Sequence, residues 1–281
     1  MKPILKRTGL LAPAILWMGV FLLIPLGFLL VYSFYTPRSL GVEKSFTFQN
    51  YFGIFGNKIT LDTVLRTVRI AATTTLLCVF IAYPAAYFLA RKVSQKKGLM
   101  LMVLLVIPFW TSSLIRTISW LPLLGRNGAI NLALLKMGLL DHPLDAFLFS
   151  EFALQIALIQ YYVVFMIGPL YIFLSQIPEN ILNAAKTLGA GNWNIFFHIV
   201  LPLSVPGMVI GCLFVFVLCL GNFEVPKFVG GIVQTIGLVI LNTVTILNWP
   251  KAAAFSSILV VITLIAVILL LKMTDVKKLF S

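Results

Sequence analysis

The most informative segment of the chain reads Ile177-Pro-Glu-Asn-Ile-Leu-Asn-Ala-Ala-Lys-Thr-Leu-Gly-Ala-Gly191 and is followed by His198-Ile-Val-Leu-Pro202. It is polar and weakly helical, whereas the segments on both sides of it are apolar enough for a bilayer. A shaped polar loop between two membrane spans is expected to carry function. The loop 177–202 therefore predicts a docking surface for a cytoplasmic partner.

The composition places the chain among membrane proteins. Of its 281 residues, 60% are hydrophobic and 10% are charged, whereas soluble domains carry about 25% charged residues. The net charge is +13, but the basic residues flank apolar runs and form no stripe interleaved with aromatics, so we expect no nucleic-acid partner. The three cysteines lack metal-ligand spacing and are expected to be buried thiols; they are Cys78, Cys212 and Cys219.

Six segments approach the length of about 20 apolar residues that a membrane helix needs. They are residues 10–32, 70–90, 99–120, 152–174, 205–223 and 252–271. Pro84 and Pro108 lie inside two of them, where prolines are tolerated and predict kinks. The first run exceeds the roughly 7–15-residue core of a signal peptide, so we expect it to be retained. The chain is thus predicted to be an all-helical membrane protein with one domain, residues 1–281.

Basic clusters predict the orientation of the spans, because short basic loops stay in the cytoplasm. One cluster lies between the second and third spans, at 91–97, and the others lie at the two ends of the chain: Lys2, Lys6, Arg7, Lys272, Lys277 and Lys278. Six spans allow all three clusters to face one side. The N- and C-termini and the loop 177–202 are therefore predicted to be cytoplasmic.

The longer connecting segments, 36–69, 121–151 and 225–251, are predicted on the outer side. Within the last, residues 232–247 form a further apolar stretch that is interrupted by polar residues. A seventh span there would place Lys272 outside, so we prefer an interfacial amphipathic helix or a re-entrant helix. Residues 128–140 are expected to form a short helix at the outer surface.

The loop has the features of a short helix. Pro178 suits a first turn and Glu179 complements the positive end of the helix dipole. Gly189 and Gly191 are expected to end the helix. An apolar stripe at helical spacing would run along one side, formed by Ile181, Leu182, Ala185 and Leu188. From the residues alone, a docking helix and an ordinary connecting loop with an amphipathic piece both remain open.

The residues that follow this helix lead back to the membrane. The aromatic run of Trp193, Phe196 and Phe197 is expected to pack towards the bilayer. Pro202 and Pro206 are expected to open the fifth span.

The sequence lacks the motifs of an ATP-hydrolysing or metal-dependent enzyme. There is no G-x-x-x-x-G-K-[ST] run to cradle a phosphate. The two histidines, His142 and His198, lie in different loops, so neither a histidine-based triad nor a metal site is supported. We expect no cofactor in this chain, and any energy must come from another subunit.

The spacing of Asn183-Ala184-Ala185, Gly189, Leu201 and Pro202 resembles the EAA loop of membrane subunits of binding-protein-dependent ABC importers. In that family the loop forms a short helix that sits in a groove of the ATPase. The resemblance implies a type I ABC importer permease (MetI-like) fold in a bacterial inner membrane. It also implies four kinds of partner: a second and distinct permease chain, two ATPase subunits that bind ATP and Mg, a soluble substrate-binding protein, and membrane lipid.

One departure from the family pattern is that Asn183 stands where an acidic residue is usual. An asparagine can still form a hydrogen bond but no ion pair with the ATPase.

Further runs resemble the permeases of spermidine/putrescine-type importers. They are Ile107-Pro-Phe-Trp-Thr-Ser-Ser-Leu-Ile-Arg116, Gly128-Ala-Ile-Asn131, Leu201-Pro-Leu-Ser-Val-Pro-Gly207 and Val229-Gly230-Gly231. The resemblance implies an importer permease for a polyamine. Because this subfamily includes carriers of other small organic solutes, opines, amino acids and phosphonates stay open as alternatives.

Two charges near the membrane are candidates for a function. Arg116 lies in the outer half of the third span and Glu224 ends the fifth. They either pair with each other, or Glu224 faces the pathway and meets a cationic substrate. In the second case, Trp110 and Phe223 would offer aromatic faces to an ammonium group. Gly207 and Gly211 form a G-x-x-x-G pair that predicts close contact with another helix.

The rival class is an ion-coupled secondary transporter. It would need coupling-ion sites at mid-membrane, often in an internal repeat with broken spans. Six spans, the lack of a repeat and the few acids within the spans disfavour it.

Overall fold

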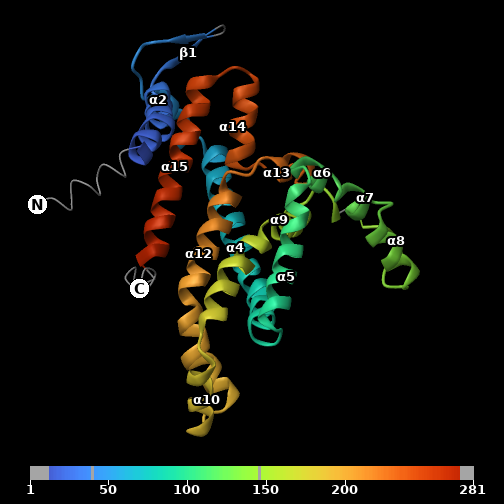
Figure 1. Cartoon of the computed structure of the whole chain (residues 1–281). Helices are drawn as coiled ribbons and strands as arrows, with labels where there is room; N and C mark the ends of the chain where they lie inside the picture. Colours follow the sequence, from blue (N-terminus) through green and yellow to red (C-terminus); the bar gives the residue numbers. More distant parts are fainter. Residues whose placement is uncertain (1–12, 39–40, 145–146, 273–281) are drawn as a thin grey trace, which may run out of the picture. The chain divides into compact units, whose positions relative to one another are not determined.

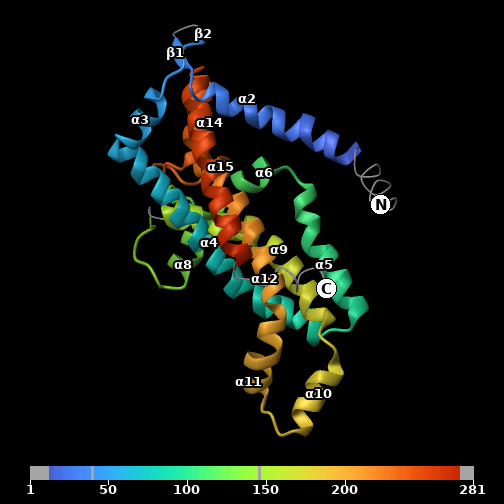
Figure 2. The ribbon, with the colours of Figure 1, turned by 90° about the vertical axis from the view of Figure 1, so that its left-hand side faces the viewer.

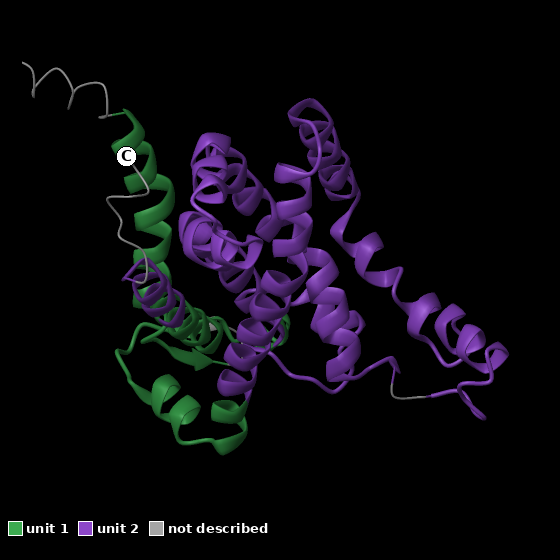
Figure 3. Cartoon of the chain, turned by 90° about the horizontal axis from the view of Figure 1, so that it is seen from below, with its two compact units in different colours: residues 1–62, 239–261 green, residues 63–238, 262–281 purple. Residues whose placement is uncertain are grey.

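The computed structural model describes residues 13–38, 41–144 and 147–272 of the chain. It is mostly helical, as Figure 1 shows. The chain falls into two compact units, Met1–Asp62 with Val239–Val261 and Thr63–Leu238 with Ile262–Ser281, which Figure 3 colours separately. The terminal residues Lys2, Lys6, Arg7, Lys277 and Lys278 lie outside the described residues, so the side that each terminus faces remains a prediction.

Five helices among the described residues are long and apolar enough to cross a membrane, and a bent pair makes a sixth. The five are Pro13–Tyr32, Lys58–Arg91 (α4), Glu151–Gln176 (α9), Asn192–Leu220 and Trp249–Lys272 (α15). The first includes a π-helical turn at Gly19–Leu23 and α2 at Ile24–Tyr32. The predicted helical architecture with six spans is therefore confirmed when the bent pair counts as one span.

The second unit is built around α9 and α12 (Leu201–Leu220), which pack side by side (Figures 1 and 2). A Cβ atom added to Gly207 would lie 2.8 Å from the Pro169 carbonyl oxygen, and one added to Gly211 would lie 2.5 Å from Met166 Sδ. At Gly207 the short contact is with backbone, so only glycine permits this approach there. The close contact predicted from G-x-x-x-G is thus made with another span of the same chain.

Hydroxyl and amide groups, some of them buried, join α4 to these two helices. Thr74 Oγ1 donates to Gln155 Oε1 at 2.8 Å, and Gln155 Nε2 donates to Thr73 Oγ1 at 2.6 Å. The hydroxyl groups of Tyr83 and Ser204 lie 2.9 Å apart, on α4 and α12. In a bilayer no water satisfies such groups, so each pair also fixes how the helices face one another.

The third predicted span is broken, which corrects the expectation of one helix over 99–120. Gln95–Val106 (α5) leads into a 3₁₀ turn at Ile107–Trp110, and Ser113–Ile118 (α6) follows after a bend of 93°. Pro108 has no N–H for a helical bond, and Thr111 and Ser112 are extended, with ψ of 154° and 134°. The chain continues through Leu121–Leu124 (α7) to Ala129–Lys136 (α8), the short helix predicted within 128–140.

The fifth predicted span starts earlier than expected. Asn192–Ile195 (α11), a π-helical turn at Phe196–Val200 and α12 form one continuous helix. The prediction that Pro202 and Pro206 open the span was wrong, because both lie inside it. The wider π turn lets the chain run on although Pro202 offers no N–H. The helix ends at Leu220, before the predicted end at Phe223.

The first unit contains the sheet that the all-helical expectation omitted. Thr36–Arg38 (β1) and Gly41–Glu43 (β2) form an antiparallel pair. Gln49–Phe55 (α3) follows, and Asn50 Nδ2 donates to the carbonyl oxygens of Ser33 and Tyr35, both at 2.9 Å.

The apolar stretch 232–247 holds Ile236–Thr245 (α14), a helix of 10 residues. At 1.5 Å per residue it covers about 15 Å, half of the roughly 30 Å of a bilayer core. A seventh span is therefore not formed.

Candidate functional site: a ring-lined cavity and a protruding loop helix

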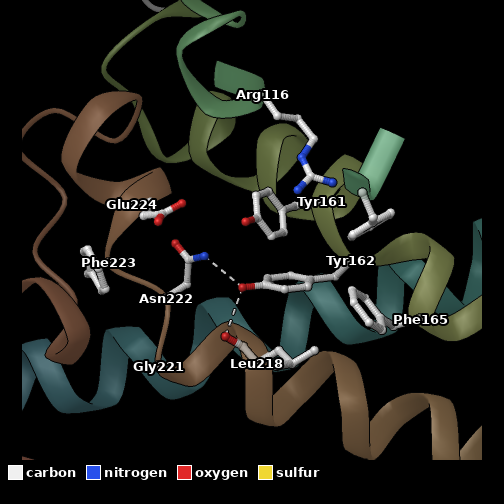
Figure 4. A pocket seen from close by; sticks show the side chains of 10 residues that line it. Arg116, Tyr161, Tyr162, Phe165, Leu218, Gly221, Asn222, Phe223 and Glu224 are labelled. Atoms are coloured by element: carbon white, nitrogen blue, oxygen red, sulfur yellow. Dashed lines mark hydrogen bonds between the residues drawn. The ribbon is translucent and has the colours of Figure 1, made fainter. Parts of the chain in front are cut away.

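A cavity of about 340 Å³ opens in the second unit, where the broken third span meets the end of the fifth (Figure 4). Its walls come from the 3₁₀ turn, α6, α9, the end of α12 and Glu224–Phe228 (α13). The lining residues are Phe109, Arg116, Tyr161, Tyr162, Phe165, Leu218, Gly221, Asn222, Phe223 and Glu224. Half of these residues are aromatic, and two of the others carry opposite charges.

Glu224 is the first residue of α13 and presents its carboxylate to the cavity. Ser113 Oγ donates to Glu224 Oε1 at 3.1 Å. Glu224 Oε2 is buried and has no hydrogen-bond partner within the described chain. A buried carboxylate oxygen without a partner carries a large desolvation penalty, which a bound cation would offset.

Arg116 is held by rings rather than by an acid. Its guanidinium carbon lies 4.4 Å from the ring centre of Phe109 and 4.5 Å from that of Tyr161. Its Nε and Nη1 are buried without hydrogen-bond partners in the described residues. In Figure 4, the Tyr161 ring stands between Arg116 and Glu224.

The ion pair that the sequence left open between Arg116 and Glu224 is not formed. The ion pairs of the described residues are Arg38 with Glu43 and Arg69 with Glu151. Both charges therefore face the same cavity, and each has buried atoms that form no hydrogen bond within the described residues.

A hydrogen-bond chain fixes the floor of the cavity. Tyr162 OH donates to the Leu218 carbonyl oxygen at 3.0 Å, and Asn222 Nδ2 donates to Tyr162 OH at 2.8 Å. Asn222 Oδ1 accepts from Val225 N–H at 3.0 Å and so caps the start of α13. The position of Glu224 thus depends on Tyr162 through Asn222.

Of the three pathway residues predicted from sequence, Glu224 and Phe223 line the cavity and Trp110 does not. Trp110 is 84% exposed, and its neighbour Phe109 forms the wall instead. The 3₁₀ turn explains this, because successive residues point about 120° apart in it.

Sequence reasoning also missed Tyr161, Tyr162 and Asn222. Two adjacent tyrosines inside an apolar span were the available signal.

The predicted loop helix is present as Glu179–Thr187 (α10), and it has no buried residue. Figure 2 shows α10 beside α11 at one end of the second unit, and Figure 1 shows α6 and α13 away from this end. Asn183 and Ala184 are exposed and Ala185 is half-buried. Of the expected apolar stripe, Ile181 and Leu188 are 43% and 88% exposed. An exposed apolar face on a protruding helix is suited to binding another protein.

Gly189 ends the helix as predicted. Its φ is +84°, a left-handed value that favours glycine. Gly189 N–H donates to the Lys186 carbonyl oxygen at 2.9 Å, and Ala190 N–H donates to the Ala185 carbonyl oxygen at 3.0 Å. These two bonds form a Schellman motif, which sets the direction in which the chain leaves α10.

Leu201 and Pro202 lie at the base of the loop rather than on α10. Leu201 is half-buried and Pro202 is exposed. Pro202 lines a second cavity of about 470 Å³ together with Pro178 and Ile181. The structure therefore brings both ends of the loop together, and Pro202 meets α10 at Ile181, near its first turn.

The described residues contain no group of three or more His, Cys, Asp or Glu side chains that could hold a metal ion.

Comparison with known proteins adds independent information. The chain matches the family described as binding-protein-dependent transport system inner membrane component over residues 82–274. It is 36% identical over 243 residues to the spermidine/putrescine transport system permease protein PotB of Haemophilus influenzae, covering 85% of this chain and 84% of that protein. PotB of Escherichia coli K12 is 34% identical over 249 residues, covering 88% and 90%.

A solved structure shares the fold. It is a chain of the bacterial alginate ABC transporter in complex with alginate pentasaccharide-bound periplasmic protein, with a TM-score of 0.74 at 17% identity. The match covers 97% of this chain and 95% of that chain.

Proposed function

Because the chain belongs to the family of binding-protein-dependent transport system inner membrane components, we propose that it forms half of an ATP-driven import pathway for a polyamine. As a member of that family it is a transport component of the inner membrane and not an enzyme. The names of its relatives support spermidine or putrescine as the solute. The observation that carries the proposal is a buried oxygen of Glu224 that has no partner in the described residues and lies in a cavity walled by rings.

The chemistry of a polyamine suits this cavity. Its ammonium groups are separated by short methylene chains, so each needs an acceptor or a ring face and each linker needs an apolar wall. Glu224 offers a carboxylate oxygen, and Phe223 and Tyr161 offer ring faces. A charge-assisted hydrogen bond combined with cation–π contact would replace the water that the ammonium group loses.

Import also needs partners that supply the energy and deliver the solute. We assign α10 as the segment that docks on an ATPase subunit, with Asn183, Ala184 and Ala185 at the contact. Two such ATPases would bind ATP and Mg, and a second, distinct permease chain would complete the pathway. A soluble binding protein would deliver the solute from outside. Closure of the ATPases would bring the loops together and rock the spans between inward-open and outward-open states.

A second solute class is favoured by Arg116. Its two buried N–H positions have no partner in the described chain, and they would suit a carboxylate. An opine or amino acid, which carries both an ammonium and a carboxylate group, could place one at Glu224 and the other at Arg116.

The experiment is uptake by purified complex in vesicles with two variants, Glu224→Gln and Arg116→Gln. For a polyamine, Glu224→Gln should lower uptake by about tenfold or more, because hydrogen bonds to charged groups contribute about 1.5–3 kcal/mol. Arg116→Gln should leave polyamine uptake equal or higher, because it removes a like charge. For an amphoteric solute both variants should lose uptake.

The control is Asp62→Asn, which removes an exposed acid on the same predicted side of the membrane. The amount of intact complex is measured in every case. It should not change in Glu224→Gln, because this variant breaks no ion pair to Arg116. Wild-type spermidine uptake by Glu224→Gln would exclude Glu224 from the pathway.

A further inference from the structure

Both ends of the loop that carries α10 are attached to the last turns of one helix, α4. At the first end, Arg91 Nη2 donates to the Ile177 carbonyl oxygen at 2.8 Å. Ile177 lies between α9 and α10 and is 5% exposed, with an extended backbone. Arg91 therefore holds the two-residue link, Ile177–Pro178, on which α10 would pivot.

At the second end, the Phe196 ring packs edge-on against two rings of α4. Its centre lies 5.7 Å from that of Tyr83 and 6.1 Å from that of Tyr87. Tyr83 also bonds to Ser204, one helical turn into α12. The π turn places Phe196 inward while Trp193 and Phe197, which stack on each other, stay exposed.

The same turns of α4 receive the start of α5. A Cβ atom on Gly98 would lie 2.8 Å from the Leu89 carbonyl oxygen and 3.0 Å from Tyr171 OH. Gly98 is buried in this contact. From there α5 runs to the 3₁₀ turn, whose Phe109 holds Arg116 at the cavity. A continuous path of packed elements thus leads from the loop ends to the cavity.

Because α10 has no buried residue, the two anchored ends of its loop offer a route by which a displacement imposed on it reaches the membrane helices. We propose that Tyr83, Tyr87 and Arg91, here termed the α4 clamp, hold both ends and transmit the displacement of α10 to the pathway. Arg91 is a positioning residue in this scheme. The proposal rests on the docking role proposed for α10.

The test compares Arg91→Gln with Arg91→Lys in the complete complex with its ATPase and binding protein. Arg91→Gln removes the charged donor to Ile177, and Arg91→Lys keeps a charge and a shorter donor. The matched control is Lys92→Gln, which removes the neighbouring and exposed positive charge. Three quantities are measured: the ATPase that co-purifies, the rate of ATP hydrolysis, and solute uptake per ATP hydrolysed.

We expect Arg91→Gln to retain the ATPase and to hydrolyse ATP, because the exposed face of α10 is unchanged. Its uptake per ATP should fall by about tenfold, as for loss of a hydrogen bond from a charged group. Arg91→Lys should recover part of this ratio, and Lys92→Gln should match the wild type. The second contact is tested by Phe196→Leu, which keeps an apolar side chain but removes the ring and should also lower uptake per ATP.

Two results would overturn the clamp. One is a wild-type ratio of uptake to ATP in Arg91→Gln. The other is uptake and hydrolysis falling together with the amount of complex in both Arg91 variants and in Phe196→Leu, which would make these residues purely structural. Failure of the docking role gives a different result from both of these. If α10 does not dock on the ATPase, a variant that disrupts α10 would leave the amount of bound ATPase unchanged.

Discussion

Replacing Gly189 with valine should uncouple ATP hydrolysis from transport. A Cβ atom at this position would meet nothing within 4 Å, so the penalty is confined to the backbone, whose φ is +84°. A left-handed conformation costs an ordinary residue about 1–2 kcal/mol and a β-branched one more. The fraction of molecules that form the Schellman motif at the end of α10, and so hold the loop in its docked shape, should fall by about tenfold or more. Asparagine tolerates a left-handed backbone better, so stimulated ATP hydrolysis by Gly189→Asn should lie between that of Gly189→Val and that of the wild type.

The assay is ATP hydrolysis stimulated by the solute-loaded binding protein, measured in reconstituted complex together with the amount of bound ATPase. Gly138→Val is the matched control. Gly138 ends α8 in the same motif, with φ of +69° and open space for a Cβ atom, so it adds the same strain outside the loop. Stimulated hydrolysis at the wild-type rate in Gly189→Val would refute the docking role of α10, as would an equal loss in Gly138→Val.

Two further predictions concern topology and the floor of the cavity. The native cysteines Cys78, Cys212 and Cys219 are first removed. A cysteine at Ser94 should then be protected from a membrane-impermeant thiol reagent in intact cells, whereas one at Lys58 should react. The reverse pattern would invert the topology and place α10 outside. Tyr162→Phe should lower the stability of the complex by about 1–3 kcal/mol, because Leu218 and Asn222 lose a buried partner. Thermal unfolding measures this, and a stability loss no larger than that of Tyr161→Phe, which keeps the ring against Arg116, would remove Tyr162 from the positioning of Glu224.

The membrane class, the helical spans and the end of α10 could be predicted because each depends on local chemistry. Apolar length sets a span, and Gly189 ends α10 because few other residues adopt its backbone conformation. The small sheet and the break in the third span were missed. Pro108 predicts a kink, but its size depends on Thr111 and Ser112, whose extended backbone is stable only where protein or a cavity lies beside it.

The cavity was harder to predict because its walls come from segments far apart in the chain. Glu224 and Phe223 were found, since a charge at the end of an apolar run is conspicuous. Phe109 was missed in favour of Trp110, because which of two adjacent aromatics faces inward depends on the turn geometry. Likewise, the contact of Arg91 with Ile177 joins residues 86 positions apart, and no local pattern in the sequence predicts it.

If this chain carries a polyamine across the membrane by using ATP hydrolysed on another subunit, uptake of labelled spermidine must be seen in a reconstituted system. The vesicles hold this chain, its partner permease and the ATPases, with binding protein outside and ATP inside. We predict uptake that requires ATP and the binding protein and that persists when ion gradients are collapsed. Uptake driven by an ion gradient without the ATPases, or no spermidine uptake by the assembled and ATP-hydrolysing complex, would contradict it.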